Sequence, residues 1–403
     1  MSTGQSPVKP VLGPSERIQN LPPYALATVL QARDEKLRQG VDVIDLGVGN
    51  PDLRPPRPVI EALKAALDDP AVQNHRYPSF NGLPEFRGAV ASWYQDRFGV
   101  ALDPAREALA LVGSKEGIFK FFLAHFDPGD TLLLCTPCYP AYLGQSAISQ
   151  IRMIEVPLQA RHRWLPDLTA IPVEEARRAK AIAINFPNNP TAATETAGFY
   201  QDLLRFARDH DLFVISDIAY CDLSLDPSYR ARSFLEFDRD RERTVEFHSF
   251  SKSYSMQGWR VAFAAGHAPA LARMHQIKSN TDYGVFMAIQ RAAICALADT
   301  QGYCAGVSAV YRARRDAFLE AIRPLGYPVE PPRATIYVWL PVPPGHSGSM
   351  EFTRDLLEKA GVVVAPGSGF GRAGEGYVRV ALCDTEARLA EAGARMAKAG
   401  LRW

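Results

Sequence analysis

Short apolar runs alternate with helix-like segments between about residues 84 and 245, and this alternation limits the fold more than any other feature of the chain. The apolar runs fall at residues 131–134, 181–186, 212–216 and 244–248. Helix-like stretches such as residues 115–125 and 197–210 lie between them. Such an order is typical of βαβ units, in which successive strands lie parallel. We therefore expect an α/β fold whose mainly parallel sheet is flanked by helices.

The pattern changes after Gly284. A long helical stretch runs to about Leu319, and the segments that follow it are short strands at residues 336–340, 362–365 and 377–381 and a terminal helix from residue 386. Such a mixture is typical of a smaller α+β domain. A chain of 403 residues is long enough for one large and one small domain. We expect a flexible N-terminal arm at 1–14, a large domain at 55–290, and a small domain at 15–54 and 291–403.

The composition favours small-molecule chemistry. Forty-five basic and 44 acidic residues leave a formal charge of +1, so no broad positive field exists to hold nucleic acid or an anionic membrane. The first 14 residues lack the basic and apolar regions of a secretory signal, and no apolar run is long enough to span a bilayer. Six cysteines, four of them isolated, suit a reducing compartment. We expect a cytoplasmic protein.

Two motifs resemble binding sites that we do not expect here. Cys135 and Cys138 have the spacing of a zinc or redox pair, but a structural zinc needs two further ligands and no second clustered pair occurs. We expect no metal there, with Cys135 ending a buried strand and Cys138 in the loop beyond it. Residues 369–374 have the G-x-G-x-x-G spacing of a dinucleotide site. An apolar strand follows them instead of a helix, which argues against a nicotinamide enzyme.

Lys252 is the strongest candidate for a catalytic residue. It follows an apolar run directly and lies among serine hydroxyls, with Arg260 eight positions later. An amine can form a Schiff base with an aldehyde, and pyridoxal 5′-phosphate supplies both an aldehyde and a phosphate for the neighbouring hydroxyls and arginine. An ordinary solvated loop lysine is the alternative interpretation of this stretch.

Polar residues at the ends of successive strands support the catalytic interpretation. Asn189, Asp217 and Lys252 follow three of the apolar runs, with spacings of 28 and 35 residues. In open α/β sheets the carboxyl ends of the strands meet at the ligand site. A carboxylate such as Asp217 would keep the pyridine nitrogen of the cofactor protonated, while Tyr220 and Asn189 could bond its ring oxygen. A turn or cap aspartate is the alternative for Asp217.

The same pattern predicts a phosphate site. Ser114 stands at a predicted helix N-cap, where the first helical N–H groups, including that of Lys115, point outward. Ser249, Ser251 and Arg260 would complete the cradle, the arginine through paired charge-assisted bonds. Arg379 lies within an apolar strand, and a buried cation needs an anionic partner. That partner is either a substrate α-carboxylate or a structural salt bridge.

Together these residues resemble the class I/II aminotransferases, which are pyridoxal-phosphate enzymes of fold type I. The resemblance covers about residues 18–382. Its markers are Gly49-Asn50-Pro51-Asp52, Tyr77 with Gly82, Asn188-Asn189-Pro190-Thr191, Asp217 with Tyr220, Ser249 with Ser251 and Lys252, Arg260, and Arg379. The chain departs from the family at Ala192, where a glycine is more usual after Asn-Pro-Thr, and we expect this to alter only the turn beyond Asn189.

The resemblance assigns roles to these residues. It implies that Lys252 holds the cofactor and moves the proton of the substrate, that Asp217 pairs with the pyridinium, that Tyr139 stacks on the ring, and that Arg379 clamps the α-carboxylate. Gly49 and Tyr24 would border the substrate. Tyr77 at the cofactor and Asn280 at the substrate would reach in from a second subunit, which implies a homodimer with shared active sites.

Several runs are similar to those of LL-diaminopimelate aminotransferases. They are residues 113–118, 165–168, 278–282 and 366–371. Such an enzyme exchanges an amino group between glutamate and the tetrahydrodipicolinate/LL-diaminopimelate pair in lysine biosynthesis by a ping-pong mechanism. Lys115 and Asn280 would bind the distal end of the substrate, and Cys138, where glycine or serine is more usual, would change the rim of the pocket.

Other functions on the same fold stay open at this point. Relatives that act on aspartate, alanine, methionine or aromatic amino acids differ only by small pocket changes. A carbon–sulfur β-lyase would use the same Lys252 and Asp217 but release ammonia and pyruvate. A cofactor-binding regulatory domain would need a helix-turn-helix appendage, for which the N-terminal arm is too short.

Overall fold

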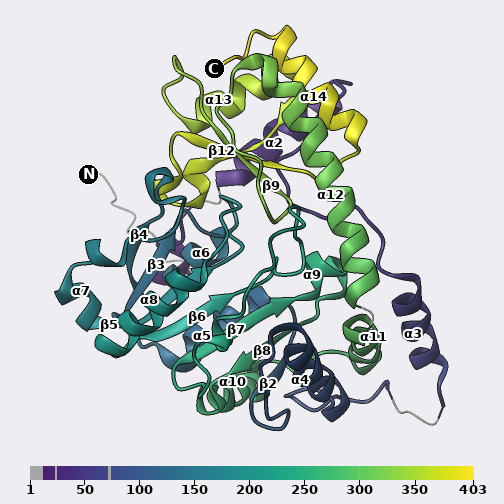
Figure 1. The fold of residues 1–403 in the computed structure, drawn as a ribbon, viewed down its shortest axis with the longest axis vertical. Helices are drawn as coiled ribbons and strands as arrows, with labels where there is room; N and C mark the ends of the chain where they lie inside the picture. The colour runs from purple at the N-terminus through teal and green to yellow at the C-terminus, as the bar shows by residue number, and fades with distance from the viewer. Residues whose placement is uncertain (1–11, 23–24, 71–73, 299) are drawn as a thin grey trace, which may run out of the picture.

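The computed structural model of the chain describes residues 12–22, 25–70, 74–298 and 300–403 (Figure 1). The wide lower part is built on a seven-stranded sheet with the order β2-β8-β7-β6-β5-β3-β4. Its strands are β2 (Ala108–Leu111), β3 (Thr131–Thr136), β4 (Arg152–Pro157), β5 (Ala179–Asn185), β6 (Phe213–Asp217), β7 (Thr244–Ser249) and β8 (Ala262–Gly266). Neighbouring strands are parallel except in the two pairs that involve β8. The expected α/β fold with a mainly parallel sheet is confirmed.

The central strands are apolar because both of their faces are covered. All six residues of β3 are buried, and β5 is buried apart from Lys180. Successive strand residues point to opposite faces, so Leu133 and Leu134 pack into different cores. A strand that is buried on both faces has a continuous run of apolar residues, and these runs are what predicted the strands from the sequence.

Helices lie on both sides of this sheet. One face packs against α5 (Ser114–His125), α6 (Pro140–Ile148) and α10 (Ala268–Thr281). The other face packs against α4 (Pro84–Phe98), α8 (Ala197–Asp209) and α11 (Met287–Ala298). Outside α11 lies α3 (Arg57–Asp68). The carboxyl ends of the parallel strands stay uncovered by these helices and face the upper part of the molecule (Figure 1).

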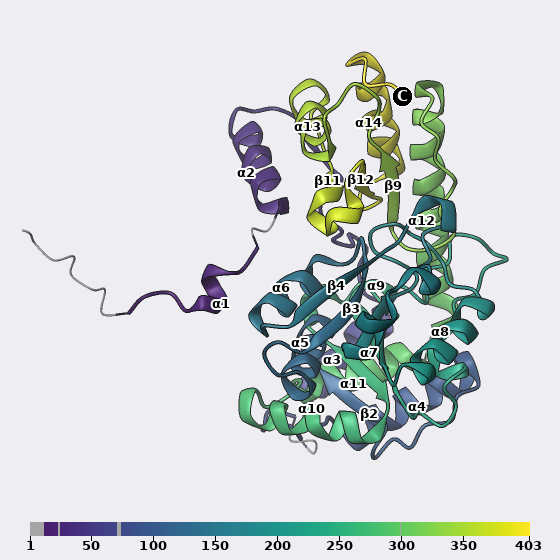
Figure 2. The same cartoon turned by 90° about the vertical axis from the view of Figure 1, so that its left-hand side faces the viewer.

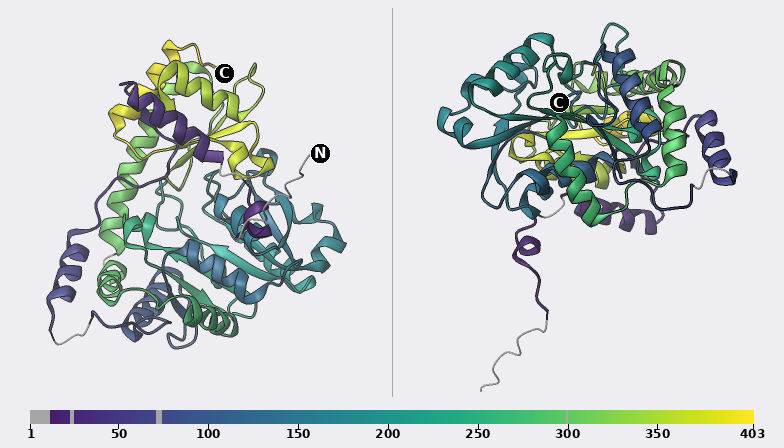
Figure 3. Two further views of the ribbon diagram at one scale, coloured as in Figure 1. Left: turned by 180° about the vertical axis from the view of Figure 1, so that it is seen from behind. Right: turned by 90° about the horizontal axis from the view of Figure 1, so that it is seen from below.

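The upper part is a smaller α+β unit. An antiparallel sheet of order β11-β12-β9 joins β9 (Tyr337–Pro341), β11 (Ala365–Pro366) and β12 (Tyr377–Ala381), and β1 (Ile44–Asp45) pairs in parallel with β10 (Val362–Val363). Its helices are α12 (Thr300–Ile322), α13 (Ser349–Asp355) and α14 (Glu386–Lys398). From behind, α2 (Ala25–Arg38) lies across this unit beside the C-terminal elements (Figure 3).

The helical stretch expected after Gly284 consists of two helices, α11 and α12, and α11 packs with Phe86 and Trp93 of α4 in the core below the large sheet. The division into domains stays a prediction, and the packing of α11 favours a boundary after this helix instead of at residue 290.

The segment before α2 stands apart from both units. Residues 1–11 of the expected N-terminal arm lie outside the described residues. Residues 12–22, with α1 (Glu16–Gln19), run beside α6, away from the main body, and Leu12 and Ile18 are exposed there (Figure 2). Across the part of the chain that the structure describes, every helix is too short or too polar to cross a membrane.

Two glycines test the packing of the upper unit. A Cβ added at Gly393 of α14 would lie 2.5 Å from the Cβ of Ala321 and 3.0 Å from its carbonyl carbon, whereas a Cβ at Gly306 of α12 would meet nothing within 4 Å. We expect Gly393→Ala to lower the free energy of unfolding by about 1–3 kcal/mol through overpacking. Gly306→Ala should raise it by about 0.5–1 kcal/mol, because alanine loses less backbone entropy in a helix. Urea unfolding followed by circular dichroism measures both, and a stabilised Gly393→Ala would contradict the close packing of α12 and α14.

Candidate active site

A cavity of about 290 Å³ lies between the carboxyl ends of the large sheet and the upper unit. Every predicted site residue that the structure describes lines it, apart from Tyr77 and Asn280. The predicted residues at the cavity are Gly49, Ser114, Lys115, Tyr139, Asn189, Asp217, Tyr220, Ser249, Ser251, Lys252, Arg260 and Arg379. Residues from seven separate segments of the chain therefore lie around one cavity. Asn189, Asp217 and Lys252 are among them, as expected for residues that follow neighbouring strands.

Lys252 enters the cavity from a short helix, α9 (Phe250–Ser253). The sequence suggested only a loop. Ser249 ends β7 and caps this helix by accepting a hydrogen bond from the amide of Ser251. The Lys252 Nζ donates to the carbonyl oxygen of Gly49 at 2.5 Å. The amine is thus held at the junction between the two units of the chain.

Asp217 is the last residue of β6 and is buried. Burial raises the pKa of its carboxyl to about 7, although the Ala219 amide and the Tyr142 hydroxyl lower it. No lysine, arginine or histidine of the described ranges forms an ion pair with it. A buried carboxylate without a counter-ion costs free energy, so this site fits a ligand that brings a positive charge.

Two asparagines connect Asp217 to the opposite side of the cavity. Asn185, the last residue of β5, donates from Nδ2 to the Asp217 carbonyl oxygen at 2.8 Å and accepts from the Asn189 amide at 2.8 Å. Asn189 in turn accepts from Nη1 of Arg379 at 2.8 Å. Asn185 was not among the predicted residues. Its position opposite Asp217 in the sheet, as another polar residue at a strand end, was the signal that could have identified it.

Arg379 is buried within β12. Its Nη2 donates to the Gly47 carbonyl oxygen at 2.8 Å, and its guanidinium lies 4.2 Å from the ring centre of Tyr337 and 4.8 Å from that of Phe370. Its Nε is buried without a partner. No carboxylate of the described chain pairs with this cation, so the structure does not support the alternative of a structural salt bridge. The site fits an anionic ligand.

Tyr337 is a cavity residue that the sequence did not reveal. Its hydroxyl lies 2.9 Å from that of Tyr220, and a Cβ at position 49 would lie 2.1 Å from it, which explains the glycine there. An aromatic residue in an apolar strand is usually a core residue, so no feature of the sequence distinguished Tyr337 from its neighbours. Burial, followed by the neighbouring Tyr337, raises the pKa of Tyr220 well above its usual range. The Tyr220 hydroxyl therefore remains a neutral hydrogen-bond donor.

The predicted phosphate cradle lies at the first turn of α5. Ser114 is the first helical residue and Gly113 is the N-cap, so the prediction of Ser114 as the cap is wrong by one position. Gly113 has a φ of +86°, and a Cβ there would lie 2.2 Å from Nη2 of Arg260. The glycine is thus required by both the turn and the arginine. The open space between Ser249, Ser251 and Arg260 at a helix N-terminus fits an anion such as phosphate.

The cysteine pair, Cys135 and Cys138, and the turn at Ala192 lie outside the lining of the cavity. Cys135 is within β3, Cys138 is in the loop beyond it, and both are buried free thiols. Burial raises the pKa of both. Ala192 has a φ of +58° and donates its amide to the Asn188 carbonyl oxygen at 2.9 Å, so it occupies a left-handed position that glycine favours.

Two of the predicted residues that the structure describes, Tyr77 and Asn280, do not line the cavity of their own chain. Tyr77 is 79% exposed and packs its ring 4.3 Å from that of Tyr283. Asn280 is exposed on α10 and donates to the Gln276 carbonyl oxygen. Tyr24 lies outside the described residues. Action of Tyr77 and Asn280 from a second subunit stays a prediction.

Comparison with known proteins identifies the family. Residues 41–395 match the family described as aminotransferase class I and II. The chain belongs to the class I and II aminotransferases. It is similar to the LL-diaminopimelate aminotransferase of Desulforudis audaxviator, with 48% identity over 93% of this chain and 95% of the relative. It is also similar to that of Syntrophobacter fumaroxidans, with 46% identity over 93% and 96%.

Solved aminotransferase structures share the whole fold. A probable N-succinyldiaminopimelate aminotransferase from Thermus thermophilus matches with a TM-score of 0.88 and 38% identity, over 93% of this chain and all of the other. Substrate-bound BacF from Bacillus subtilis matches with a TM-score of 0.91 and 33% identity, over 97% and 98%. The chain is therefore a fold type I aminotransferase that uses pyridoxal 5′-phosphate. The unpaired Asp217, the open cradle at Arg260 and the amine of Lys252 fit this cofactor.

A substitution at Gly113 tests the cradle. We expect Gly113→Ala to displace Arg260 and weaken binding of pyridoxal 5′-phosphate by about 10- to 100-fold, the effect of losing a charge-assisted hydrogen bond. The matched control is Gly129→Ala, because Gly129 has a similar φ of +91° but no atom within 4 Å of an added Cβ. Equilibrium titration of the cofactor-free proteins measures the affinities. Equal losses in both variants would show that backbone strain, and not displacement of the arginine, is the cause.

The raised pKa of Asp217 predicts a pH effect on the cofactor-free protein. The folded chain holds this proton more tightly than the unfolded chain, with a pKa of about 7 against the usual 3.8. The stability that it contributes is present below about pH 4 and is lost as the pH rises to about 7. Without cofactor, Asp217→Asn should therefore melt at a higher temperature than the unsubstituted protein at about pH 8, with a smaller difference at about pH 4.

Thermal melting at both pH values measures this difference. Glu246, whose pKa is also raised to about 7 by burial, is present in both proteins and cancels in the comparison. With cofactor bound, the order at high pH should reverse, because the carboxylate then pairs with the pyridinium. A difference that does not change with pH would contradict a protonation effect at Asp217.

Proposed function

We propose that the cavity holds pyridoxal 5′-phosphate on Lys252 and that the enzyme moves an amino group between an amino acid and a 2-oxo acid in a ping-pong cycle. One observation carries the proposal. The Lys252 amine faces the same cavity as a buried carboxylate without a cation, Asp217, and a buried guanidinium without a carboxylate, Arg379. The two charges are complementary to the pyridinium of the cofactor and the carboxylate of an amino acid.

The cofactor would be held along the large sheet. Asp217 would pair with the ring nitrogen, Tyr139 would stack on the ring, and Tyr220 and Asn189 would bond the ring oxygen. The phosphate would bind to Ser114, the Lys115 amide, Ser249, Ser251 and Arg260, with Tyr77 of a second subunit. When bound, the cofactor withdraws electrons from the α-carbon of the substrate.

The protein groups would then position the substrate and move its proton. Arg379 would hold the α-carboxylate in a fixed orientation, because Asn189 and Gly47 already hold its two terminal nitrogens. Gly49 leaves room beside the substrate, and its carbonyl oxygen keeps the Lys252 amine in reach of the α-carbon. Lys252 would take the proton of the α-carbon at Nζ and hold it for the second proton transfer of the reaction. Tyr220 stays protonated and donates a hydrogen bond throughout.

We propose the LL-diaminopimelate pair as substrate and glutamate as amino donor. Relatives of 43–48% identity over at least 93% of this chain carry the name LL-diaminopimelate aminotransferase, which supports a place in lysine biosynthesis. Lys115 lines the cavity and forms no ion pair with a described carboxylate, so it can bind a second carboxylate of the substrate. Asn280 would assist from a second subunit.

An exposed aromatic surface supports a homodimer. Tyr77 and Tyr283 are 79% and 54% exposed, and the ring of Phe80 stacks on Tyr283 at 5.2 Å. Exposed clusters of large apolar side chains are characteristic of protein interfaces. Cys135, Cys138, Cys221 and Cys383 are free thiols, which suits the cytoplasm.

Half-reactions with single substrates test this function. We expect glutamate and LL-diaminopimelate each to change the visible absorbance of the holoenzyme and to release a stoichiometric amount of 2-oxo acid. Lys252→Ala should abolish this reaction, because it removes the amine that would hold the cofactor and take the α-proton. Aspartate, alanine and aromatic amino acids complete the panel. Release of pyruvate and ammonia from cystathionine, without an amino-transfer half-reaction, would instead identify a carbon–sulfur β-lyase.

A further inference from the structure

We propose that Asp222 is a positioning residue for Lys252. Its carboxylate lies on the face of the large sheet opposite the cavity, where it binds His248 and Arg97 and thereby fixes the two segments that carry Lys252 and Tyr220. The inference rests on the proposed role of Lys252, and it concerns residues that do not touch substrate or cofactor.

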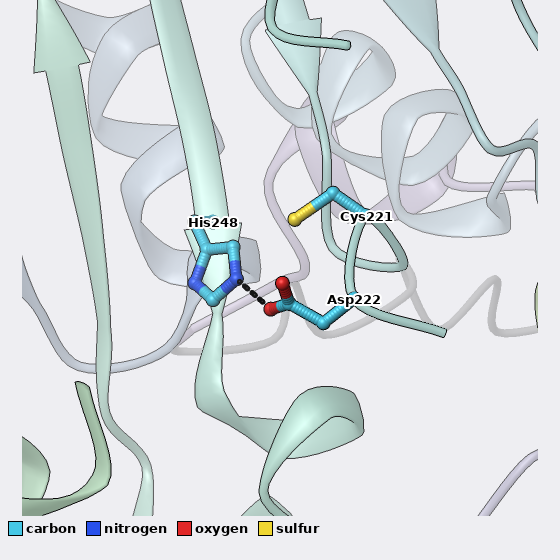
Figure 4. Close-up of side chains that lie close together, drawn as sticks. All are labelled: Cys221, Asp222 and His248. Carbon is cyan, nitrogen blue, oxygen red and sulfur yellow. Dashed lines mark hydrogen bonds and ion pairs between the residues drawn. The ribbon is translucent and has the colours of Figure 1, made fainter. Parts of the chain in front are cut away.

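The carboxylate joins side chains from two different elements. Its Oδ2 lies 3.2 Å from Nε2 of His248 in β7 (Figure 4). Its Oδ1 accepts a hydrogen bond from Nε of Arg97 in α4 at 3.3 Å. Nη2 of Arg97 also donates to the Cys221 carbonyl oxygen at 3.0 Å. Asp222 and His248 are 5% and 0% exposed. The network is therefore shielded from water, and its bonds act at low dielectric.

His248 lies directly behind the Lys252 segment. Successive residues of β7 point to opposite faces, so Ser249 faces the cavity while His248 faces α4. The His248 ring packs 4.7 Å from that of Trp93 and stacks 4.8 Å from that of Phe263. The hydrogen bond to Asp222 further restricts the rotation of this ring. The end of β7, from which α9 and Lys252 begin, is thus held from behind.

Asp222 also lies in the turn that follows β6. The Leu223 amide donates to the Tyr220 carbonyl oxygen at 3.0 Å, and the Ser308 hydroxyl of α12 donates to the Asp222 carbonyl oxygen at 3.2 Å. Helix α12 contacts the Lys252 segment as well, because Cys304 Sγ donates to the Ser253 carbonyl oxygen at 3.5 Å. One carboxylate and one helix therefore connect the turn of Tyr220 to the helix of Lys252.

The Asp222 carboxylate is charged and forms an ion pair with Arg97. Burial raises the pKa of Asp222, but His248, Arg97 and the Ser253 hydroxyl lower it more, to about 2, so the carboxylate is ionised. Nδ1 of His248 is buried without a partner, whereas Nε2 faces the carboxylate. The proton of a neutral imidazole therefore belongs on Nε2, where it is donated to Asp222.

A metal ion is the competing occupant of this cluster. The ligand atoms of Cys221, Asp222 and His248 lie within 4.8 Å of one another. Arg97, however, binds one carboxylate oxygen and places a positive charge at the site, and burial raises the pKa of the Cys221 thiol well above its usual range. Cation binding needs a thiolate and free oxygens. The geometry therefore favours the hydrogen-bonded network.

Two variants and a matched control test the role of Asp222. Asp222→Asn leaves one of its two buried donors without an acceptor, and His248→Gln keeps an N–H donor at a similar reach. The control is Glu246→Gln, because Glu246 lies on the same face of β7, is also fully buried, and accepts hydrogen bonds from Ser216, Ser233, Tyr94 and the Phe234 amide far from the cavity. Asp222→Asn and Glu246→Gln should both lower the melting temperature.

Asp222→Asn should alter the active site, whereas Glu246→Gln should not. We expect Asp222→Asn to lower kcat about 10- to 100-fold, the effect of a misplaced catalytic group, with KM changed less than about threefold. His248→Gln should retain more activity than Asp222→Asn. The fraction of cofactor bound through Lys252, measured by visible absorbance, should fall in Asp222→Asn and stay unchanged in Glu246→Gln.

Three results would overturn the proposal. They are equal kcat and absorbance in the Asp222 and Glu246 variants, loss of activity explained by unfolding alone in both Asp222→Asn and His248→Gln, and stoichiometric zinc that Asp222→Asn removes. If the unsubstituted protein transfers no amino group but Asp222→Asn still loosens the cofactor at Lys252, the proposed reaction fails and the positioning role stands.

Discussion

The burial of Asp217 and Arg379 without protein counter-ions is the constraint on which the rest of the site depends. Removing a charge from water costs several kcal/mol unless a partner compensates, so a fold that retains two such groups must hold them rigidly until a ligand supplies the opposite charges. Asn185 and Asn189 provide that rigidity, because they connect the end of β6 to the Arg379 guanidinium. In the proposed function, the cofactor ring and the substrate carboxylate would supply the compensating charges.

The cavity exists only where the two units of the chain meet. Contacts between Lys252 and the Gly49 carbonyl oxygen, and between Arg379 and Asn189, join the large sheet to the upper unit. Tyr337 of β9 fills the space that Gly49 leaves and bonds Tyr220. In the proposed function, substrate recognition would therefore be coupled to the relative position of the units, while the cofactor contacts would come mainly from the large sheet.

Glu246 and Asp222, two buried carboxyl groups on the other face of the sheet, show how hydrogen-bond and ion-pair partners determine the pKa of a buried acid. Burial raises the pKa of Glu246 to about 7, although four donors, three of them hydroxyls, lower it. The pKa of Asp222, which is also shielded from water, falls to about 2 because His248 and Arg97 face it. Neutral donors compensate only part of the desolvation at Glu246, whereas an imidazole and a guanidinium together compensate more than all of it at Asp222.

The sheet and most of the cavity could be predicted from the amino-acid sequence. Apolar strands buried on both faces are a local pattern, and polar residues at their carboxyl ends, such as Asn189, Asp217 and Lys252, converge in a parallel sheet. The other features of the site depend on tertiary contacts. Tyr337 resembles a core residue until its strand packs against Gly49, and His248 gains its carboxylate from a turn 26 residues away in the chain. Contacts between distant segments depend on how the two units pack, and no local pattern of residues encodes that packing.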